Sequence, residues 1–248
     1  MIGVILAAGM AKRLRPLTDK CPKCLLEIGG RTLLERTVDA MRKAGITDFV
    51  VVTGYQEHMI RTFLEDYAQQ QNAQSSGHLT FTFLNNADYE HNNNIYSLWM
   101  ATQHLRGKEF LLMDSDILCD PKAVLEVASQ PVTALALNRH DLGEEEMKIV
   151  VDSEMRITEI SKTCKIEDAL GESVGIEKIM SDYSVALTDE LNQMICQEQL
   201  IDIFYERAFE RLIPKGFTFK VVDTTQYFSY ELDTPEDFEK AKELWPYK

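Results

Sequence analysis

Short apolar runs alternate with amphipathic stretches through the first half of the chain. Continuous apolar runs occupy residues 2–6, 49–52 and 110–113, and each has the length of a strand buried on both faces. Between them, residues 32–44, 56–68 and 95–105 place apolar positions at helical spacing. Residues 79–83 alternate apolar side chains with threonines, which predicts a further strand with one wetter face.

This β-α-β-α order predicts an α/β fold with a doubly wound, mostly parallel sheet and ligands at the carboxyl ends of its strands. Thr32 and Glu35 have the form of a capping box, and Gly45 follows as the terminator of the same helix. Thr234 and Pro235 suit an N-cap and a first turn, so a helix is expected from about residue 235. The polar stretch 69–78 is predicted to be a surface loop.

The second half has a less regular pattern. We predict strands at 132–138, 148–151, 156–160, 174–179 and 217–222, and helices near 183–195 and 198–212. Because no internal repeat or low-complexity tail is evident, we expect a single domain over residues 1–248 whose sheet is extended by a second lobe.

Charge and cysteine content limit the classes of partner. A net charge of −14 argues against nucleic acid and anionic membranes, since either needs an extended basic face. No apolar run reaches about eighteen residues, so no membrane span is expected, and the first residues lack the pattern of a signal peptide. Five cysteines without a second C-x-x-C or His pair favour a reducing, cytoplasmic location over a zinc site or disulfide framework.

A loop of small residues follows the first strand and precedes a basic segment. Small side chains leave backbone N–H groups uncovered, so a polyphosphate can approach them closely. Residues 12–23 contain five basic side chains and one acid, although the chain as a whole is acidic. The segment therefore predicts a cradle for a nucleoside triphosphate. The predicted nucleotide-binding residues are Leu6, Ala7, Ala8, Gly9, Met10, Ala11, Arg13 and Lys23, with Gly54, Asn94, Ser97 and Asp114 further along the chain.

Carboxylates cluster at two distant places. Asp114 and Asp116 follow the buried run 110–113, and Glu231 and Asp233 precede the helix predicted from residue 235. Two carboxylates together with phosphate oxygens suffice to hold Mg²⁺, which prefers oxygen ligands and keeps several waters. The alternative is that these aspartates only cap the next element, as aspartates in turns commonly do.

Residues 6–14 and Pro22–Lys23 together resemble the pattern L-A-A-G-x-G-x-R-L … P-K of nucleotidyltransferases that attach NMP to phosphorylated sugars and alcohols. Ala11 stands where that pattern has its second glycine. The resemblance implies Mg²⁺-dependent transfer with release of pyrophosphate, and it implies Asp116 and Asp233 as the metal ligands. Lys23 is expected to stabilise charge on the α-phosphate, and Arg13 to hold the phosphates that leave.

Two segments resemble phosphocholine cytidylyltransferases in particular. Residues 92–99 are similar to their N-N-x-Y-S-L segment, and residues 200–206 to a later aromatic and acidic stretch. An ammonium head group needs aromatic faces and a carboxylate, which these segments contain. The acceptor-binding residues that the resemblance and these residue types imply are Tyr96, Trp99, Lys148, Glu172, Asp202, Tyr205 and Glu231, with Lys162 as a further lysine facing the acceptor phosphate. Ordinary core packing is the alternative for the aromatic residues.

These observations favour transfer of CMP from CTP to phosphocholine or a close amino-alcohol phosphate. A nucleotide-binding half is expected over residues 1–120 and an acceptor-binding half over residues 121–248. Sugar-1-phosphate nucleotidyl transfer, 2-aminoethylphosphonate cytidylyl transfer and a non-catalytic nucleotide-binding module are the alternatives. Retention of Lys23, Arg13 and both metal-site aspartates argues against the non-catalytic module.

Overall fold

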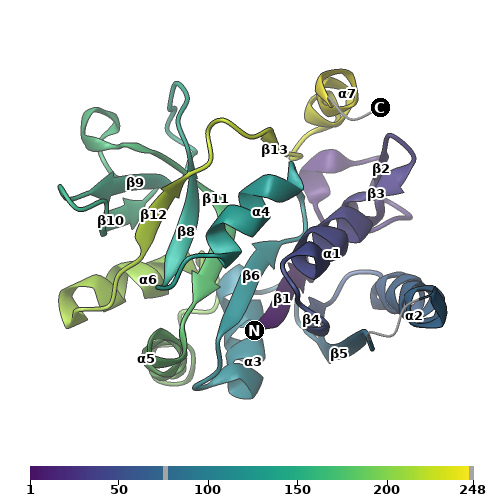
Figure 1. The fold of residues 1–248 in the computed structure, drawn as a ribbon, viewed down its shortest axis with the longest axis horizontal. Coiled ribbons are helices and arrows are strands. Elements are labelled where there is room, and N and C mark those ends of the chain that lie inside the picture. The colour runs from purple at the N-terminus through teal and green to yellow at the C-terminus, as the bar shows by residue number, and fades with distance from the viewer. Residues whose placement is uncertain (75–77, 246–248) are drawn as a thin grey trace.

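Four parallel strands form the core of the sheet in the computed structural model, which describes residues 1–74 and 78–245. Their spatial order is β6–β1–β4–β5 (Figure 1). The bounds are β1 (Ile2–Ala7), β4 (Asp48–Thr53), β5 (Thr80–Asn85) and β6 (Phe110–Asp114). β1 lies in the middle, since Val4 pairs with Val50 on one side and with Leu112 on the other. The predicted parallel core is confirmed.

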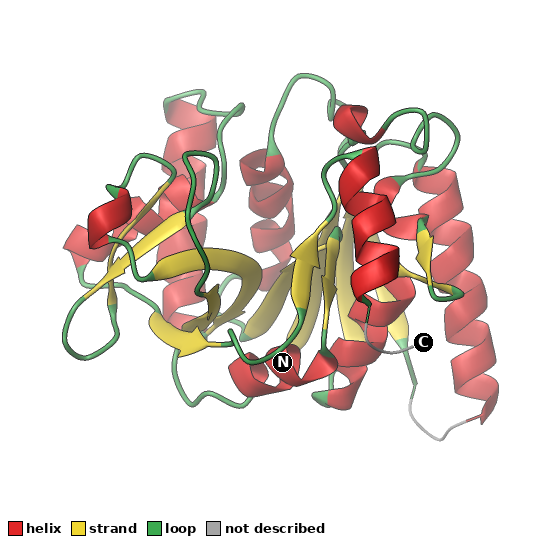
Figure 2. Ribbon diagram, turned by 90° about the horizontal axis from the view of Figure 1, so that it is seen from above, coloured by secondary structure: helices red, strands yellow, loops and turns green. Residues whose placement is uncertain are grey.

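Helices cover both faces of this core (Figure 2). Val4 and Leu6 point into a cluster with α3 (Asn94–Leu105) and α5 (Ser181–Asn192). Ile5 and Ala7 point into the opposite cluster with α1 (Leu33–Lys43), α2 (Glu57–Gln74) and α4 (Pro121–Ala128). A strand that is apolar at successive positions is therefore buried on both sides, which is the doubly wound arrangement predicted from its sequence.

An antiparallel extension carries the sheet beyond β6. The long strand β11 (Gly171–Ile179) pairs with β6 through its second half and with β9 (Lys148–Val151) through its first residues. Its other edge pairs with β8 (Ala134–Asn138), and a register shift interrupts that pairing between Ser173 and Glu177. β10 (Ile157–Ser161) continues beyond β9, and β12 (Lys220–Asp223) pairs with β8 in parallel. β11 thus connects the parallel core to a second lobe.

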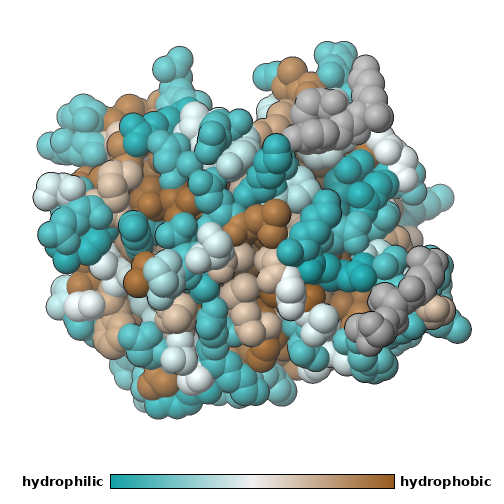
Figure 3. Space-filling model, in the orientation of Figure 1, coloured by the Kyte–Doolittle hydropathy of each residue, from teal (hydrophilic) through white to brown (hydrophobic). Residues whose placement is uncertain are grey.

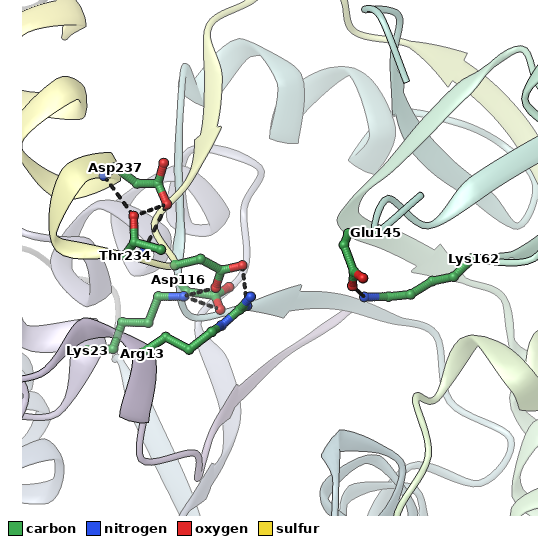
Figure 4. A network of polar contacts seen from close by, with 8 residues as sticks. Arg13, Lys23, Asp116, Glu145, Lys162, Thr234 and Asp237 are labelled. Carbon is green, nitrogen blue, oxygen red and sulfur yellow. Dashed lines mark hydrogen bonds and ion pairs between the residues drawn. The ribbon is translucent and has the colours of Figure 1, made fainter. Parts of the chain in front are cut away.

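The end of the chain returns to its beginning. β13 (Ser229–Glu231) pairs with β7 (Ile117–Cys119), and α7 (Pro235–Leu244) lies near β2 (Glu27–Ile28) and β3 (Arg31–Thr32) at the top of Figure 1. Leu14, Leu118, Leu232, Phe238 and Trp245 belong to a third apolar cluster that joins these segments. The capping box of α7 consists of Thr234 and Asp237, as Figure 4 shows, and it confirms the predicted helix start. This cluster brings residues 231–234 beside the first loop.

The observed bounds of two helices, α6 and α2, differ from the predicted ones. Residues 198–205 precede α6 (Glu206–Leu212) without forming helix, because the Ile201 carbonyl accepts from the Asn93 amide and the Tyr205 amide donates to the Asn94 side chain. α2 continues to Gln74, so the predicted loop 69–78 begins late, and its residues 75–77 lie outside the described chain. Short helical turns cover Lys12–Leu14, Lys23–Leu25, Ile166–Asp168, Gln193–Gln197 and Ile213–Lys215.

Hydrophilic residues cover most of the face drawn in Figure 3, and hydrophobic residues show in small areas between them. Among the described residues, no helix combines the length and apolar character that crossing a bilayer requires.

Gly175 lies in β11 where the pairing with β8 shifts register, between Ser173 and Glu177. Its φ is +74°, and a Cβ at this position would lie 2.9 Å from Ile117 Cδ1 and 3.0 Å from Asp114 Oδ2. We expect Gly175→Ala to lower the free energy of unfolding by about 3 kcal/mol, because left-handed strain adds to overpacking. Gly216→Ala is the matched control, since its φ is +88° but no atom lies within 4 Å of the added Cβ. It is expected to cost only about 1 kcal/mol in urea titrations, and equal losses would contradict the steric argument.

Candidate active site

A cleft of about 410 Å³ opens where β1 and β6 end. This is the edge at which ligands bind in open α/β sheets. Its walls come from both halves of the chain, because the first loop and the strand ends face the second lobe across it. The lining residues fall in 6–13, 22–24, 86–97, 114–117, 145–147, 172–175, 204–206 and 231–233, together with Lys162.

The first loop is held in a conformation that suits small residues. The Tyr55 amide donates to the Ala8 carbonyl at 2.9 Å, and the Thr18 hydroxyl donates to the Ala11 carbonyl at 3.0 Å. Ala11 has φ +46°, in the left-handed region that costs a residue with a Cβ about 1–2 kcal/mol. The backbone conformation explains why the resembled pattern has glycine at this position.

Lys23 connects the first loop to both acidic segments. Its ammonium contacts Asp116 Oδ2 at 2.9 Å and Asp233 Oδ1 at 3.1 Å, and Arg13 donates to Asp233 Oδ2 at 2.5 Å (Figure 4). Burial by itself would lower the pKa of Lys23, but the charges of Asp116 and Asp233 outweigh it and raise the pKa above its ordinary value. Lys23 is therefore a buried, charged donor at the floor of the cleft.

Three carboxylates gather beside this ammonium. Asp116, Glu231 and Asp233 each offer an oxygen within 4.8 Å of the others. Loss of solvation and then the charges of Asp116 and Asp233 raise the pKa of Glu231 to about 8, although part of the side chain is open to solvent. A hard cation with oxygen ligands would relieve this repulsion, so the donor set fits Mg²⁺. Glu231, which was predicted on the acceptor side, lies in this group.

A buried acidic network lies next to it. The Tyr205 hydroxyl is 3.0 Å from Asp114 Oδ2 and 3.4 Å from Glu177 Oε1. Burial, followed by neighbouring carboxylates, raises the pKa of both Asp114 and Glu177 well above the usual range. Burial also raises the pKa of Glu206 to about 7, and its Oε2 has no hydrogen-bond partner among the described residues. Glu206 faces the cleft from this network.

The opposite wall carries a lysine above an aromatic ring. Lys162 Nζ lies 4.6 Å from the centroid of the Phe204 ring and 3.6 Å from Glu145 Oε2, and Figure 4 shows Glu145 and Lys162 pointing toward each other. Glu172 Oε2 is 2.8 Å from His140 Nε2, and burial together with the charge of Glu146 raises the pKa of Glu172 to about 7. This wall therefore combines an exposed ring with both signs of charge.

The cleft includes most of the residues predicted to bind nucleotide. The predicted residues that line it are Leu6, Ala7, Ala8, Gly9, Ala11, Arg13, Lys23, Asn94, Ser97 and Asp114, then Asp116 and Asp233, and from the acceptor side Lys162, Glu172 and Glu231. Met10 and Gly54 are not among the lining residues. Gly54 lies behind the loop, where a Cβ would come within 2.7 Å of the Ala8 carbonyl oxygen.

Five predicted acceptor-binding residues do not line the cleft: Tyr96, Trp99, Lys148, Asp202 and Tyr205. Tyr96 and Trp99 pack on each other at 5.1 Å between centroids, and the Trp99 indole donates to Asn192. Tyr205 is 0% exposed and acts within the acidic network. Lys148 is buried against backbone carbonyls, and Asp202 is exposed elsewhere. Direct contact of these five side chains with an acceptor has no support in this geometry.

Several cleft residues were missed in the sequence. Tyr205 was predicted to line the cleft, but its two neighbours Phe204 and Glu206 do so instead. The prediction therefore identified the segment but not the side chains that face the cleft. Asn86 follows the carboxyl end of β5 and donates to Asn92 and Ser97, at 2.8 and 3.2 Å. The rule that ligands bind at strand ends would have identified it.

Residues 2–137 match the family model described as nucleotidyl transferase, and the chain belongs to that family. It is 31% identical over 242 residues to the bifunctional IPC transferase and DIPP synthase of Aquifex aeolicus, covering 96% of this chain and half the length of that relative. It is 23% identical over 244 residues to the choline-phosphate cytidylyltransferase of Streptococcus pneumoniae, covering 98% of both chains.

Two solved structures show the same fold along almost the whole chain. The CTP:phosphocholine cytidylyltransferase of Streptococcus pneumoniae superposes with a TM-score of 0.80 at 19% identity, covering 98% of this chain and 99% of that one. The inositol-1-phosphate CTP transferase of T. maritima gives 0.76 at 22% identity, covering 98% and 94%. The predicted fold class is confirmed, and the family match over residues 2–137 confirms the predicted nucleotidyltransferase family.

Binding of Mg²⁺ at the three carboxylates should stabilise the folded protein. We expect added Mg²⁺ to raise Tm by several degrees, since a ligand at a hundredfold excess over its Kd contributes about 2.7 kcal/mol. The Mg²⁺-dependent shift should disappear in Asp233→Asn and persist in Asp189→Asn, a remote exposed carboxylate paired with Arg106. Differential scanning fluorimetry with and without chelator makes the measurement, and an undiminished shift in Asp233→Asn would exclude this site.

Proposed function

We propose that this protein transfers CMP from CTP to a small phosphorylated alcohol, with Mg²⁺ as the cofactor and pyrophosphate as the second product. The observation that carries the proposal is the position of Lys23, held by Asp116 and Asp233 at the floor of a cleft lined by the small-residue loop. The opposite wall, with Lys162 and Phe204, leaves room for a second substrate. The names of the relatives support cytidylyl transfer.

The chemistry is an in-line displacement. A phosphate oxygen of the acceptor attacks the α-phosphorus of CTP, the bond from that phosphorus to the bridging oxygen breaks, and pyrophosphate leaves. An ammonium has three N–H donors, and Lys23 uses two of them on Asp116 and Asp233. The third has no further partner among the described residues and can meet an α-phosphate oxygen. Arg13 is placed to bind the leaving phosphates. A bound Mg²⁺ would neutralise charge on the phosphate oxygens.

Phosphocholine, or a close amino-alcohol phosphate, is the proposed acceptor. In the structure a positive amino group, that of Lys162, already lies over the Phe204 ring, which is 41% exposed. Glu206 adds a buried carboxylate with an unpartnered oxygen among the described residues. When Lys162 turns to the acceptor phosphate, a quaternary ammonium can take its place over the ring. Such a contact contributes about 0.5–2 kcal/mol.

An inositol phosphate is the second candidate acceptor. Glu145, Glu172 and Glu206 all line the cleft, and carboxylates accept hydrogen bonds from hydroxyl groups. The inositol-1-phosphate CTP transferase of T. maritima, which has the same fold, supports this candidate. The two candidates differ in one respect that can be tested: only the ammonium group needs a negative charge at Glu206.

Pyrophosphate release tests the proposed function. CTP, UTP, dTTP and GTP are each combined with phosphocholine, inositol phosphate, 2-aminoethylphosphonate and glucose-1-phosphate. We expect CTP with phosphocholine to give the highest kcat/KM. Lys23→Ala should lower kcat by about 10²–10³-fold with little change in the KM of CTP, as removal of a donor to the transition state does. Lys20→Ala, an exposed lysine in the same segment, should retain wild-type turnover. Turnover by Lys23→Ala near the wild-type rate would refute this role.

Glu206→Gln separates the two acceptor candidates. The substitution keeps the shape of the side chain and removes its negative charge. Because burial raises the pKa of Glu206 to about 7, the comparison is made at about pH 8.5, where the wild-type carboxylate is ionised. We expect the KM of phosphocholine to rise about tenfold, corresponding to about 1.4 kcal/mol, and the KM of inositol phosphate to change less than threefold. Asn and Gln side chains still accept hydrogen bonds from hydroxyl groups. Equal effects on both acceptors would contradict an ammonium site at Glu206.

A further inference from the structure

Lys148 is a buried cation that binds backbone rather than side chains. It is 1% exposed and lies at the first position of β9. Its Nζ donates to the carbonyls of Lys162 at 2.7 Å, Glu144 at 3.0 Å and Glu146 at 3.2 Å. An ammonium has three N–H groups, so all of them are used on these carbonyls.

The three carbonyls belong to two segments that form the outer end of the cleft. Glu144 and Glu146 flank Glu145, which lines the cleft, as does Met147. The third carbonyl is that of Lys162, whose side chain lies across from Glu145. Lys148 therefore holds the main chain on both sides of the Glu145–Lys162 ion pair shown in Figure 4.

Among the described residues, the other contacts of these two segments do less to join them. The Ser173 amide donates to the Met147 carbonyl at 2.9 Å, which ties residue 147 to β11 and not to Lys162. Pairing between β9 and β10 ends at Ser161, one residue before Lys162. The Glu145–Lys162 ion pair also joins the two segments, but Glu145 is 91% exposed at its side chain, and exposed pairs contribute little. The charge-assisted bonds of a buried ammonium are stronger than neutral ones and hold a fixed geometry.

We propose that Lys148 is a positioning residue for the acceptor. By holding both segments it sets the distance between the side chains of Glu145 and Lys162. The proposal rests on the proposed function, because it takes this end of the cleft to bind the second substrate. Lys148 acts through the main chain and does not contact that substrate. Its loss should therefore affect the acceptor and spare CTP, which binds to the first loop.

Lys178 provides a matched control. It is also buried, at 7% exposure, and also donates to two carbonyls, those of Ala128 at 3.0 Å and Gln130 at 2.6 Å. These carbonyls lie at the end of α4 and two residues beyond it, and neither these residues nor Lys178 line the cleft. Lys178 also pairs with Glu109 Oε1 at 3.0 Å, so Lys178→Met removes buried lysine-to-carbonyl bonds like those of Lys148, together with one ion pair, at a place away from the cleft.

The experiment compares the two variants in the full chain with CTP and the best acceptor of the panel. Both should lose stability, since each leaves buried carbonyls without a donor. Lys148→Met should raise the KM of the acceptor tenfold or more while the KM of CTP changes less than twofold. Lys178→Met should leave both values within twofold of wild type. An acceptor KM for Lys148→Met equal to that of Lys178→Met would overturn the proposal.

Hydrogen exchange without substrates tests, independently of any activity, whether Lys148 holds the two segments in place. Lys148→Met should accelerate exchange over residues 143–147 and 161–164, and Lys178→Met should not. Failure of every acceptor in the panel would refute the proposed function but leave this measurement decisive. If Lys148→Met does not fold, Lys148→Gln, which retains two N–H donors on a shorter side chain, takes its place. Unchanged acceptor KM and unchanged exchange in Lys148→Gln would overturn the proposal.

Discussion

The ammonium of Lys23 between Asp116 and Asp233 is the contact on which the site depends. It joins three segments that are far apart in the chain, the first loop, the end of β6 and the turn before α7. Burying such charges costs solvation, and ion pairs of this kind are weak evidence for stability. The energy that holds the segments together comes from elsewhere. The third apolar cluster, which includes Leu118, Leu232 and Phe238, fixes the turn before α7 against the first loop.

Because the apolar cluster holds the segments in place, the site can contain several charged side chains and still be ordered. Burial of the apolar cluster stabilises the contact between the segments without fixing an exact position. The capping box of Thr234 and Asp237 sets the residue at which α7 begins. Asp233 precedes that cap by one residue, so its carboxylate is placed by the helix start and not by its bond to Lys23. A phosphate or a cation can therefore exchange with the ion pairs without unfolding the segments that carry them.

The sequence predicted those parts of the molecule whose signals are local. Runs such as 2–6 and 110–113 specify the parallel core, because a strand buried on both faces needs apolar residues at successive positions. Lys23 was predicted from the basic loop and from the resemblance of Pro22–Lys23 to the P-K pair of the family. Asp116 and Asp233 were predicted from that resemblance and from their places after the run 110–113 and before the helix at residue 235. The acceptor side was less predictable. Which of Phe204, Tyr205 and Glu206 faces the cleft depends on residues 198–205, whose Ile201 carbonyl and Tyr205 amide bond to Asn93 and Asn94 at the start of α3.

The two sides of the cleft also differ in the part of the sheet that carries them. The proposed nucleotide side consists of a loop and two strand ends in the parallel core, where β1 has a neighbour on each side. The proposed acceptor side is the rim of the antiparallel extension, where Gly175 lies in the register shift of β11 and the buried Lys148 donates to three backbone carbonyls. Because this rim lies outside the parallel core, its residues can differ between relatives while the core is kept. Relatives named for choline phosphate and for inositol phosphate share this fold, which is what such an arrangement predicts.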